Sequence, residues 1–299
     1  MLEHLNPNPL KPSRVVIIGA GGFVGGTISK KLAAKAVNTL ALTRKELDLL
    51  TVSAAAKLQE ILQPGDSVVM VSAVAPAKTV PDLMLNLKMA EAVCNALSRA
   101  TIAHLVYISS DAVYADDANP VNERSYCAPS TVHGMMHAAR ELMLKSSTKA
   151  PFTALRPTLI YGAADPHNGY GPNRYRRQAA KGEPITIFGE GEEKRDHVAV
   201  EDVATLAALV LEHRSAGVLN VATGVSSSFH DITHMTAALF SNKVVVKSVP
   251  RQGPRPHLTH RFFDIADCIK AFPDFQYTSL DKGLLLAKQA EERKESWLK

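Results

Sequence analysis

The sequence has few cysteines, and their placement excludes a covalent framework. Only three occur in 299 residues, Cys94, Cys127 and Cys268, and no two of them have CxxC spacing. An odd number of widely separated thiols fits neither a disulfide-stapled fold nor a zinc site. We therefore expect a reducing, cytoplasmic location and no bound metal.

Membrane-length apolar runs and a large excess of one charge are also missing. The uncharged stretch at residues 15–29 is too short for a bilayer span and contains five glycines. The polar residues 1–13 do not resemble a signal peptide, so we expect neither export nor membrane insertion. Lys and Arg exceed Asp and Glu by 34 − 29 = 5, with one compact basic cluster at residues 174–177. This balance favours an anionic small molecule over nucleic acid.

What the sequence does contain is an alternation of short β-branched runs and helix-length segments. Residues 15–18, 39–42, 67–71 and 105–108 are typical of buried parallel strands. Helical apolar spacing occupies the intervening segments 22–36, 53–62 and 82–97. The pattern predicts an α/β fold, a Rossmann-like doubly wound parallel sheet with a smaller C-terminal substrate domain.

The domain boundaries follow from a change in composition near Tyr161. Beyond this residue, glycine, proline and asparagine interrupt the regular rhythm. We expect residues 14–160 to form mainly the dinucleotide-binding domain. Residues 161–290 should form mainly the substrate-binding region, interleaved with late elements of the first domain. Residues 1–13 and 291–299 are expected to be flexible termini.

A glycine-rich turn directly follows the first of these strands. It contains Gly19, Gly22, Phe23, Val24 and Gly25, with GxxGxxG spacing and not GxGxxG. Glycines at a strand-to-helix turn let backbone amides approach a pyrophosphate, and the helix N-terminus favours the negative charge. These five residues are the predicted cofactor-binding turn.

The residues that follow the expected strand at 39–42 indicate which dinucleotide binds. An acidic residue there would accept the ribose 2′-hydroxyl of NAD, but the sequence continues with Thr43, Arg44 and Lys45. Cations at this point favour the 2′-phosphate of NADP, unless Arg44 and Lys45 merely face solvent. We therefore expect NADP as the cofactor, with Arg44 and Lys45 contacting it.

Several segments together resemble the extended short-chain dehydrogenase/reductase family of NAD(P)-dependent nucleotide-sugar epimerases, dehydratases and reductases. The segments are residues 19–25, 106–114 (VYISSDAVY), 155–162 (LRPTLIYG), 187–191 (IFGEG) and 195–204 (RDHVAVEDVA). The resemblance spans nearly the whole chain. It implies an oxidoreductase or epimerase acting on a nucleotide-diphosphate sugar, and a possible homodimer.

The family's catalytic pattern is altered in this chain. Family members pair a Ser or Thr with a YxxxK motif; Ser110 matches the first, but His133 stands where Tyr is expected and His137 where Lys is expected. Histidine exchanges protons near neutral pH, and residues four apart share a helix face. His133 as acid/base with His137 on the ribose is one interpretation. A catalytically silent dinucleotide- or sugar-nucleotide-binding protein is the second, and a metal pair is the third.

The resemblance also suggests substrate-binding residues. Arg195 and Arg251 match positions that face the diphosphate in similar enzymes, and Asn173 resembles a pocket asparagine. Guanidinium groups suit bidentate recognition of such oxyanions. Reduction of a 4-keto sugar is the simplest reaction. A dehydratase ranks lower because Asp111-Ala112 lacks the Glu of the usual elimination pair.

Overall fold

The computed structural model describes residues 2–117, 119–240, 244–251, 253 and 258–296. Its larger part is a seven-stranded sheet in the order β1-β10-β6-β5-β4-β2-β3. All neighbouring strands are parallel except β1 and β10. The strands are β1 (Leu2–Glu3), β2 (Arg14–Ile18), β3 (Thr39–Leu42), β4 (Asp66–Met70), β5 (His104–Ile108), β6 (Phe152–Pro157) and β10 (Ala216–Val221).

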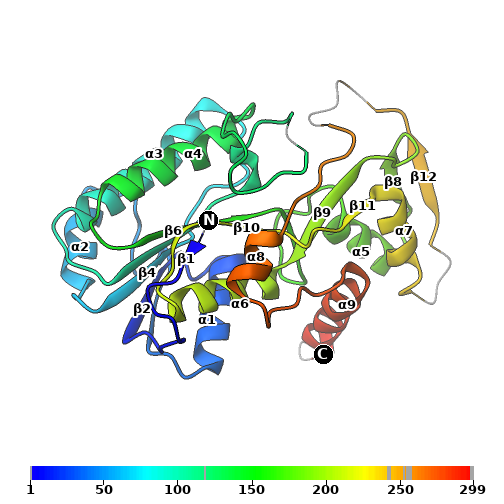
Figure 1. Cartoon of the computed structure of the whole chain (residues 1–299). Coiled ribbons are helices and arrows are strands. Elements are labelled where there is room, and N and C mark those ends of the chain that lie inside the picture. Colours follow the sequence, from blue (N-terminus) through cyan, green and yellow to red (C-terminus); the bar gives the residue numbers. More distant parts are fainter. Residues whose placement is uncertain (1, 118, 241–243, 252, 254–257, 297–299) are drawn as a thin grey trace.

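Helices cover both faces of this sheet (Figure 1). Helices α1 (Phe23–Ala34) and α6 (Val200–Glu212) pack together on one face, and α2 (Ala54–Ile61), α3 (Val80–Leu97) and α4 (Val132–Ser146) lie on the other. Alternate residues of β2 supply the two cores: Val15 and Ile17 face α1 and α6, whereas Val16 and Ile18 face the other layer. The predicted doubly wound α/β architecture is therefore confirmed.

The smaller part contains two short sheets. One pairs β7 (Leu159–Tyr161), β9 (Lys194–Ala199) and β11 (Ser226–Ser228), and the other pairs β8 (Ile185–Phe188) with β12 (Val246–Val249). Helices α5 (Pro172–Ala180), α7 (Phe229–Ala237) and α9 (Leu280–Ser296) accompany them, while α8 (Ala266–Ala271) contacts β10 and β1. A separate apolar cluster around Tyr175, Ile185 and Phe229 holds this part together.

The described parts of both chain ends contact the rest of the molecule. Leu2–Glu3 pair with β10, and the ring of His4 bonds the Ser215 hydroxyl at 2.8 Å and the Ala271 carbonyl at 2.9 Å. This pairing protects a strand that would otherwise be the edge of the sheet. At the other end, Glu291 on α9 forms an ion pair of 2.7 Å with the fully buried Arg176. This carboxylate offsets part of the cost of burying the guanidinium.

A buried histidine in β5 should make stability depend on pH. His104 is fully buried, its Nε2 donates to the Ser215 carbonyl at 2.7 Å, and burial lowers its pKa to about 4 from the usual 6.5. Between these pH values the unfolded chain binds a proton that the native state does not. Acidification from pH 6.5 to 4 should therefore remove up to about 3 kcal/mol of unfolding free energy through this group.

Urea unfolding at a series of pH values measures this effect. The His104→Gln variant keeps a donor toward Ser215 but cannot titrate, so it should lose less stability than the wild-type protein between pH 6.5 and 4. Parallel pH profiles for the two proteins would contradict the assignment.

Candidate functional site

A cleft of about 1500 Å³ lies at the carboxyl ends of the parallel strands, bordered by residues of the smaller part. Gly19 follows β2, Thr43 follows β3, Ser72 lies beyond β4 and Ser109 follows β5, and all four line it. Such an edge, where the chain connections reverse direction, is the usual ligand site of a doubly wound sheet. The predicted site residues that line the cleft are Gly19, Gly22, Phe23, Val24, Arg44, Lys45, Ser110, His133, His137, Asn173, Arg195 and Arg251.

The glycine turn is built for close backbone approach. Gly19 has φ +99°, and a side chain there would lie 2.7 Å from both the backbone nitrogen and the hydroxyl of Ser72. Gly25 does not line the cleft, but a Cβ on it would overlap the carbonyl oxygen of Gly19. Its missing side chain therefore lets α1 start tightly against the turn.

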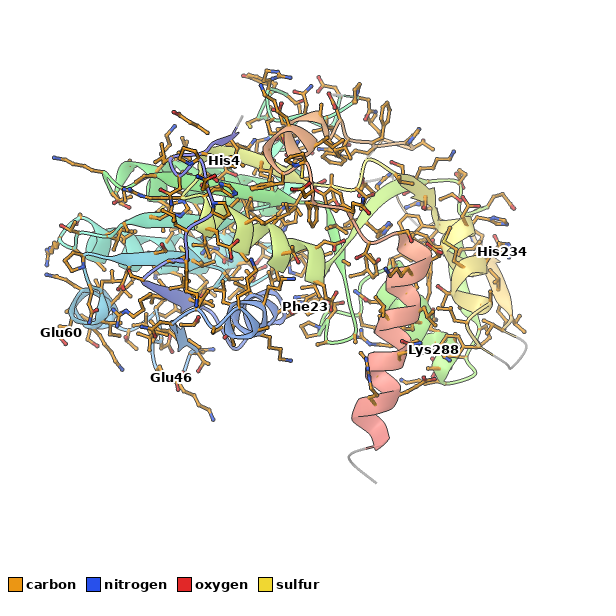
Figure 2. The ribbon with its side chains drawn as sticks, turned by 60° about the horizontal axis from the view of Figure 1, so that its bottom comes forward. His4, Phe23, Glu46, Glu60, His234 and Lys288 are labelled. Atoms are coloured by element: carbon orange, nitrogen blue, oxygen red, sulfur yellow. The ribbon has the colours of Figure 1, made fainter. Side chains whose placement is uncertain are left out.

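The first turn of α1 has features that suit an anion. Gly22 is its N-cap residue and makes no side-chain cap, and the first turn contains no acidic residue. Phe23 lies on the side of the large sheet that faces the smaller part (Figure 2). The backbone N–H groups of this turn and the helix dipole could therefore hold the phosphates of a dinucleotide.

The end of β3 carries cations whose acidic neighbours are already engaged. Arg44 is exposed and pairs with Asp48 at 3.2 Å. Glu46 accepts the backbone N–H of Thr43 at 2.9 Å and its hydroxyl. The hydrogen bonds from the Thr43 side chain and backbone lower the pKa of Glu46, so this carboxylate stays ionised as the cap of its own turn.

Ser110 caps the short 3₁₀ helix at Asp111–Val113. Its Oγ accepts the backbone N–H of Ala112 at 3.1 Å and lies 3.4 Å from an Asp111 carboxylate oxygen. The cap fixes this hydroxyl at the cleft wall, where it could donate to an oxygen of a bound ligand.

Helix α4 carries the two histidines and is anchored at several points. Thr131 caps its start by accepting the N–H of Gly134 at 3.1 Å, and a Cβ on Gly134 would overlap the carbonyl oxygen of Ala112. Further along, Glu141 forms a buried ion pair of 2.6 Å with Arg156 of β6. These contacts fix α4 against the sheet and against the 3₁₀ helix of Ser110.

The structure brings His133 and His137 together at the cleft. Their rings meet edge to face with centroids 4.7 Å apart. His133 is half-buried, its Nδ1 lies 3.4 Å from the backbone nitrogen of Ala77, and burial lowers its pKa. Burial, together with His133 and Arg140, holds the pKa of His137 well below its usual range. Both imidazoles are therefore neutral at pH 7.

Two residues beneath this pair were missed in the sequence. The Tyr107 hydroxyl lies 2.7 Å from Nδ1 of His137, and Arg140 lies over the Tyr107 ring with its guanidinium carbon 5.1 Å from the centroid. Arg140 is fully buried and donates to the Ser72 carbonyl at 2.6 Å. Its position three residues after His137 on one helix was the available signal.

The substrate side of the cleft contains a group of arginines held by carboxylates. Glu193 is buried and pairs with both Arg195, at 3.4 Å, and Arg251. Arg251 also lies over the ring of Phe188, 5.4 Å from its centroid. The structure therefore places the two predicted arginines at one carboxylate.

A third arginine, Arg261, also lines the cleft and was not predicted. It pairs with Asp116 at 2.9 Å and with Asp111 at 3.6 Å. No motif in the sequence singled it out. Together the arginines could bind the negative groups of a ligand.

Asn173 lines the cleft, but its amide already has protein partners. It donates to Asp165 at 2.8 Å and accepts the backbone N–H of Gly162 at 3.1 Å. These bonds join the start of α5 to the end of β7 and orient the loop between them.

Neither a metal-binding cluster nor a membrane-length helix occurs among the residues that the structure describes. No cluster of three or more His, Cys, Asp or Glu side chains is arranged there to hold a metal ion. Within the same residues, no helix has the length and apolar character needed to cross a bilayer.

A doubly wound sheet with a glycine turn at its ligand edge defines a dinucleotide-binding α/β protein. Residues 15–222 match the NAD dependent epimerase/dehydratase family, and the chain belongs to this family. The resemblance identified from the sequence is thereby confirmed.

Solved structures of several sugar-nucleotide enzymes share the fold. MoeE5 in complex with UDP-glucose and NAD has a TM-score of 0.81 at 22% identity, covering 94% of this chain and 99% of that chain. UDP-glucose 4-epimerase from Thermotoga maritima gives 0.80 at 19%, with coverages of 94% and 99%. A GDP-L-fucose synthetase from Naegleria fowleri bound to NADP gives 0.84 at 14%, with 98% of each chain covered.

Proposed function

We propose that the protein is an NAD(P)-dependent oxidoreductase or epimerase of nucleotide-diphosphate sugars. The observation that carries this proposal is a single cleft that holds the glycine turn, Ser110, the two histidines and the arginines. Family membership and neighbours bound to UDP-glucose or NADP support it. Reduction of a 4-keto sugar is the simplest reaction of this type.

In this proposal each group has one task. The glycine turn and the start of α1 hold the pyrophosphate of the nicotinamide dinucleotide, which supplies hydride chemistry when bound. Arg195, Arg251 and Arg261 bind the diphosphate of the sugar nucleotide. Ser110 and His133 contact the reacting oxygen, and His137 contacts the nicotinamide ribose.

Turnover with a panel of UDP- and GDP-linked sugars and keto-sugars tests the proposal. The purified protein should change NADPH absorbance with a keto-sugar nucleotide, or change the sugar's configuration as observed by NMR. Retention of the dinucleotide without turnover of any member would favour the catalytically silent binding protein.

We further propose NADP as the preferred cofactor. The residue that directly follows β3 is Thr43, and the next two are the cations Arg44 and Lys45 at the cleft edge. The nearby acids Glu46 and Asp48 already bond to Thr43 and Arg44. A 2′-phosphate would therefore lie near two positive side chains, while the carboxylates of Glu46 and Asp48 are already bonded to other groups.

Binding measurements on variants test the NADP preference. The Arg44→Ala variant should raise the Kd for NADP⁺ about tenfold, because a charge-assisted bond contributes about 1.4 kcal/mol or more. Its Kd for NAD⁺ should be unchanged. Arg99→Ala, at an exposed position outside the cleft, is the matched control. Tighter binding of NAD⁺ than of NADP⁺ by the wild-type protein, unaffected by Arg44→Ala, would contradict the preference.

A further inference from the structure

The proton position on His133 is fixed by its backbone partner. Nδ1 of His133 lies 3.4 Å from the amide nitrogen of Ala77. A backbone N–H can only donate, so Nδ1 must be the acceptor and a neutral ring must carry its proton on Nε2. No hydrogen bond within the described part of the chain engages Nε2 of this ring.

The proton position on His137 follows from the buried phenol beside it. Tyr107 is fully buried, and its hydroxyl lies 2.7 Å from Nδ1 of His137. If Nδ1 donated, the phenol proton would need another acceptor, and the described residues provide none. An unsatisfied buried donor would cost about 1–3 kcal/mol. The phenol therefore donates, and His137 also carries its proton on Nε2.

Arg140 opposes any second proton on His137. Its guanidinium is fully buried one helical turn away and forms no ion pair with a carboxylate of the described residues. It bonds instead to neutral groups, the Ser72 carbonyl at 2.6 Å and the Asn86 amide oxygen at 3.4 Å. A buried cation without a counterion raises the free energy of a nearby imidazolium.

We propose that His133 and His137 are both locked as neutral Nε2–H imidazoles and act in the cleft as hydrogen-bond donors, not as bases. Tyr107 and Arg140 are the positioning residues of this lock. In this proposal two neutral donors stand where the family has its Tyr and Lys. The positive charge that the Lys would carry at position 137 is carried instead by the buried Arg140. The identity of the acceptors, a ribose hydroxyl and the reacting oxygen of the sugar, rests on the proposed function.

Two neutral Nε2–H imidazoles can assist some reactions and not others. A neutral imidazole N–H can stabilise negative charge that develops on a carbonyl oxygen. Acceptance of a proton by either ring would require Nδ1 to give up its present bond or Nε2 to lose its proton first. The pair therefore suits hydride addition to a ketone carbon, during which negative charge develops on the oxygen and solvent water supplies its proton, better than removal of a proton from an alcohol.

Nitrogen-15 NMR of the histidine side chains in the unliganded protein tests the lock without relying on activity. Long-range proton–nitrogen spectra distinguish the protonated from the unprotonated ring nitrogen. His133→Gln and His137→Gln variants assign the two rings among the eleven histidines. At pH 7.5 both rings should be neutral with the proton on Nε2. A protonated Nδ1 on either ring would overturn the proposal.

A tyrosine pair provides the matched comparison. Tyr107→Phe removes the phenol that holds His137, so the Nδ1 signal of His137 should shift while that of His133 remains. Tyr161→Phe removes an equally buried hydroxyl that has no hydrogen-bond partner in the described residues and lies outside the cleft lining. It should leave both rings unchanged. An unchanged His137 signal in Tyr107→Phe would also overturn the proposal.

The two proposals can fail separately. If both rings carry their proton on Nε2 but the protein turns over no sugar nucleotide, the assigned proton positions stand and the enzymatic function is refuted. If the protein turns over a sugar nucleotide but His133 carries its proton on Nδ1, the enzymatic function stands and the assigned proton positions are refuted.

Discussion

Replacement of Gly25 by alanine is expected to raise the Kd for the nicotinamide dinucleotide at least about 100-fold, or about 2.7 kcal/mol. The added methyl group would overlap the carbonyl oxygen of Gly19, and backbone atoms cannot move aside as a flexible side chain can. Gly19 cannot relax easily either, because it has φ +99° and lies against Ser72. The turn must then open, and the amides of α1 lose their position relative to the phosphates.

A glycine in the same cleft provides the control for this variant. Gly169 also lines the cleft, but a Cβ there meets no atom within 4 Å. Gly169→Ala should therefore bind the dinucleotide as the wild-type protein does. Titration calorimetry gives both affinities, and circular dichroism shows whether each variant is folded. A folded Gly25→Ala protein with wild-type affinity would mean that the turn does not bind phosphate.

A milder variant keeps the test informative if Gly25→Ala does not fold. At Gly21 a Cβ would meet only the side chain of Thr43, at 3.3 Å. That side chain can shift by a few tenths of an ångström. Gly21→Ala should therefore fold and bind about threefold to tenfold more weakly, since this corresponds to roughly 0.7–1.4 kcal/mol. Unchanged affinity in this variant would oppose the assignment of the turn as a phosphate cradle.

The fold could be predicted because its strongest signals are local. The strand expected at residues 105–108 is β5 at His104–Ile108, and the segment 82–97 lies within α3 at Val80–Leu97. Fully buried parallel strands leave continuous apolar runs, and α3 has its own start signal in Thr79 and Asp82, which cap each other. Such features need no knowledge of distant contacts.

The contacts made by the termini could not be predicted, for the opposite reason. Residues 1–13 look polar and unstructured in isolation, yet His4 bonds to Ser215 and Ala271, more than 200 residues away. Arg176 appeared in the sequence as part of a compact basic cluster, but it is fully buried beside Glu291. Contacts between residues so far apart in the sequence depend on how the chain folds back on itself, and local composition does not reveal this.

The same limit applies to the site. The glycine turn and the HxxxH pair are compact motifs, so their residues could be named from spacing alone. Tyr107 and Arg261 act through contacts made by separate elements: Tyr107 reaches from β5 to α4, and Arg261 reaches back to Asp111 and Asp116. Neither has a neighbour in sequence that reveals its role. The proton positions on the histidines likewise require the partners of Nδ1.

Removal of the His133 side chain should be the most damaging change to catalysis. We expect His133→Ala to lower kcat by roughly 10²–10³, the usual effect of losing one donor to a developing oxyanion. The Kd for the dinucleotide should change little, because His133 lies on α4 and the predicted phosphate contacts lie on α1. Stopped-flow or steady-state NADPH oxidation with the best keto-sugar nucleotide gives kcat, and fluorescence titration gives the Kd.

Two further variants separate loss of a donor from loss of the ring. His133→Gln retains an N–H donor but cannot take up a proton, so it should recover part of the activity lost in His133→Ala if His133 acts as a neutral donor. Equal loss in both variants would favour a titrating imidazole. His234→Ala, at an exposed position on α7 on the far side of the smaller part (Figure 2), should retain full activity. Full activity in His133→Ala would show that the reacting oxygen does not contact His133, because this variant removes the proposed donor.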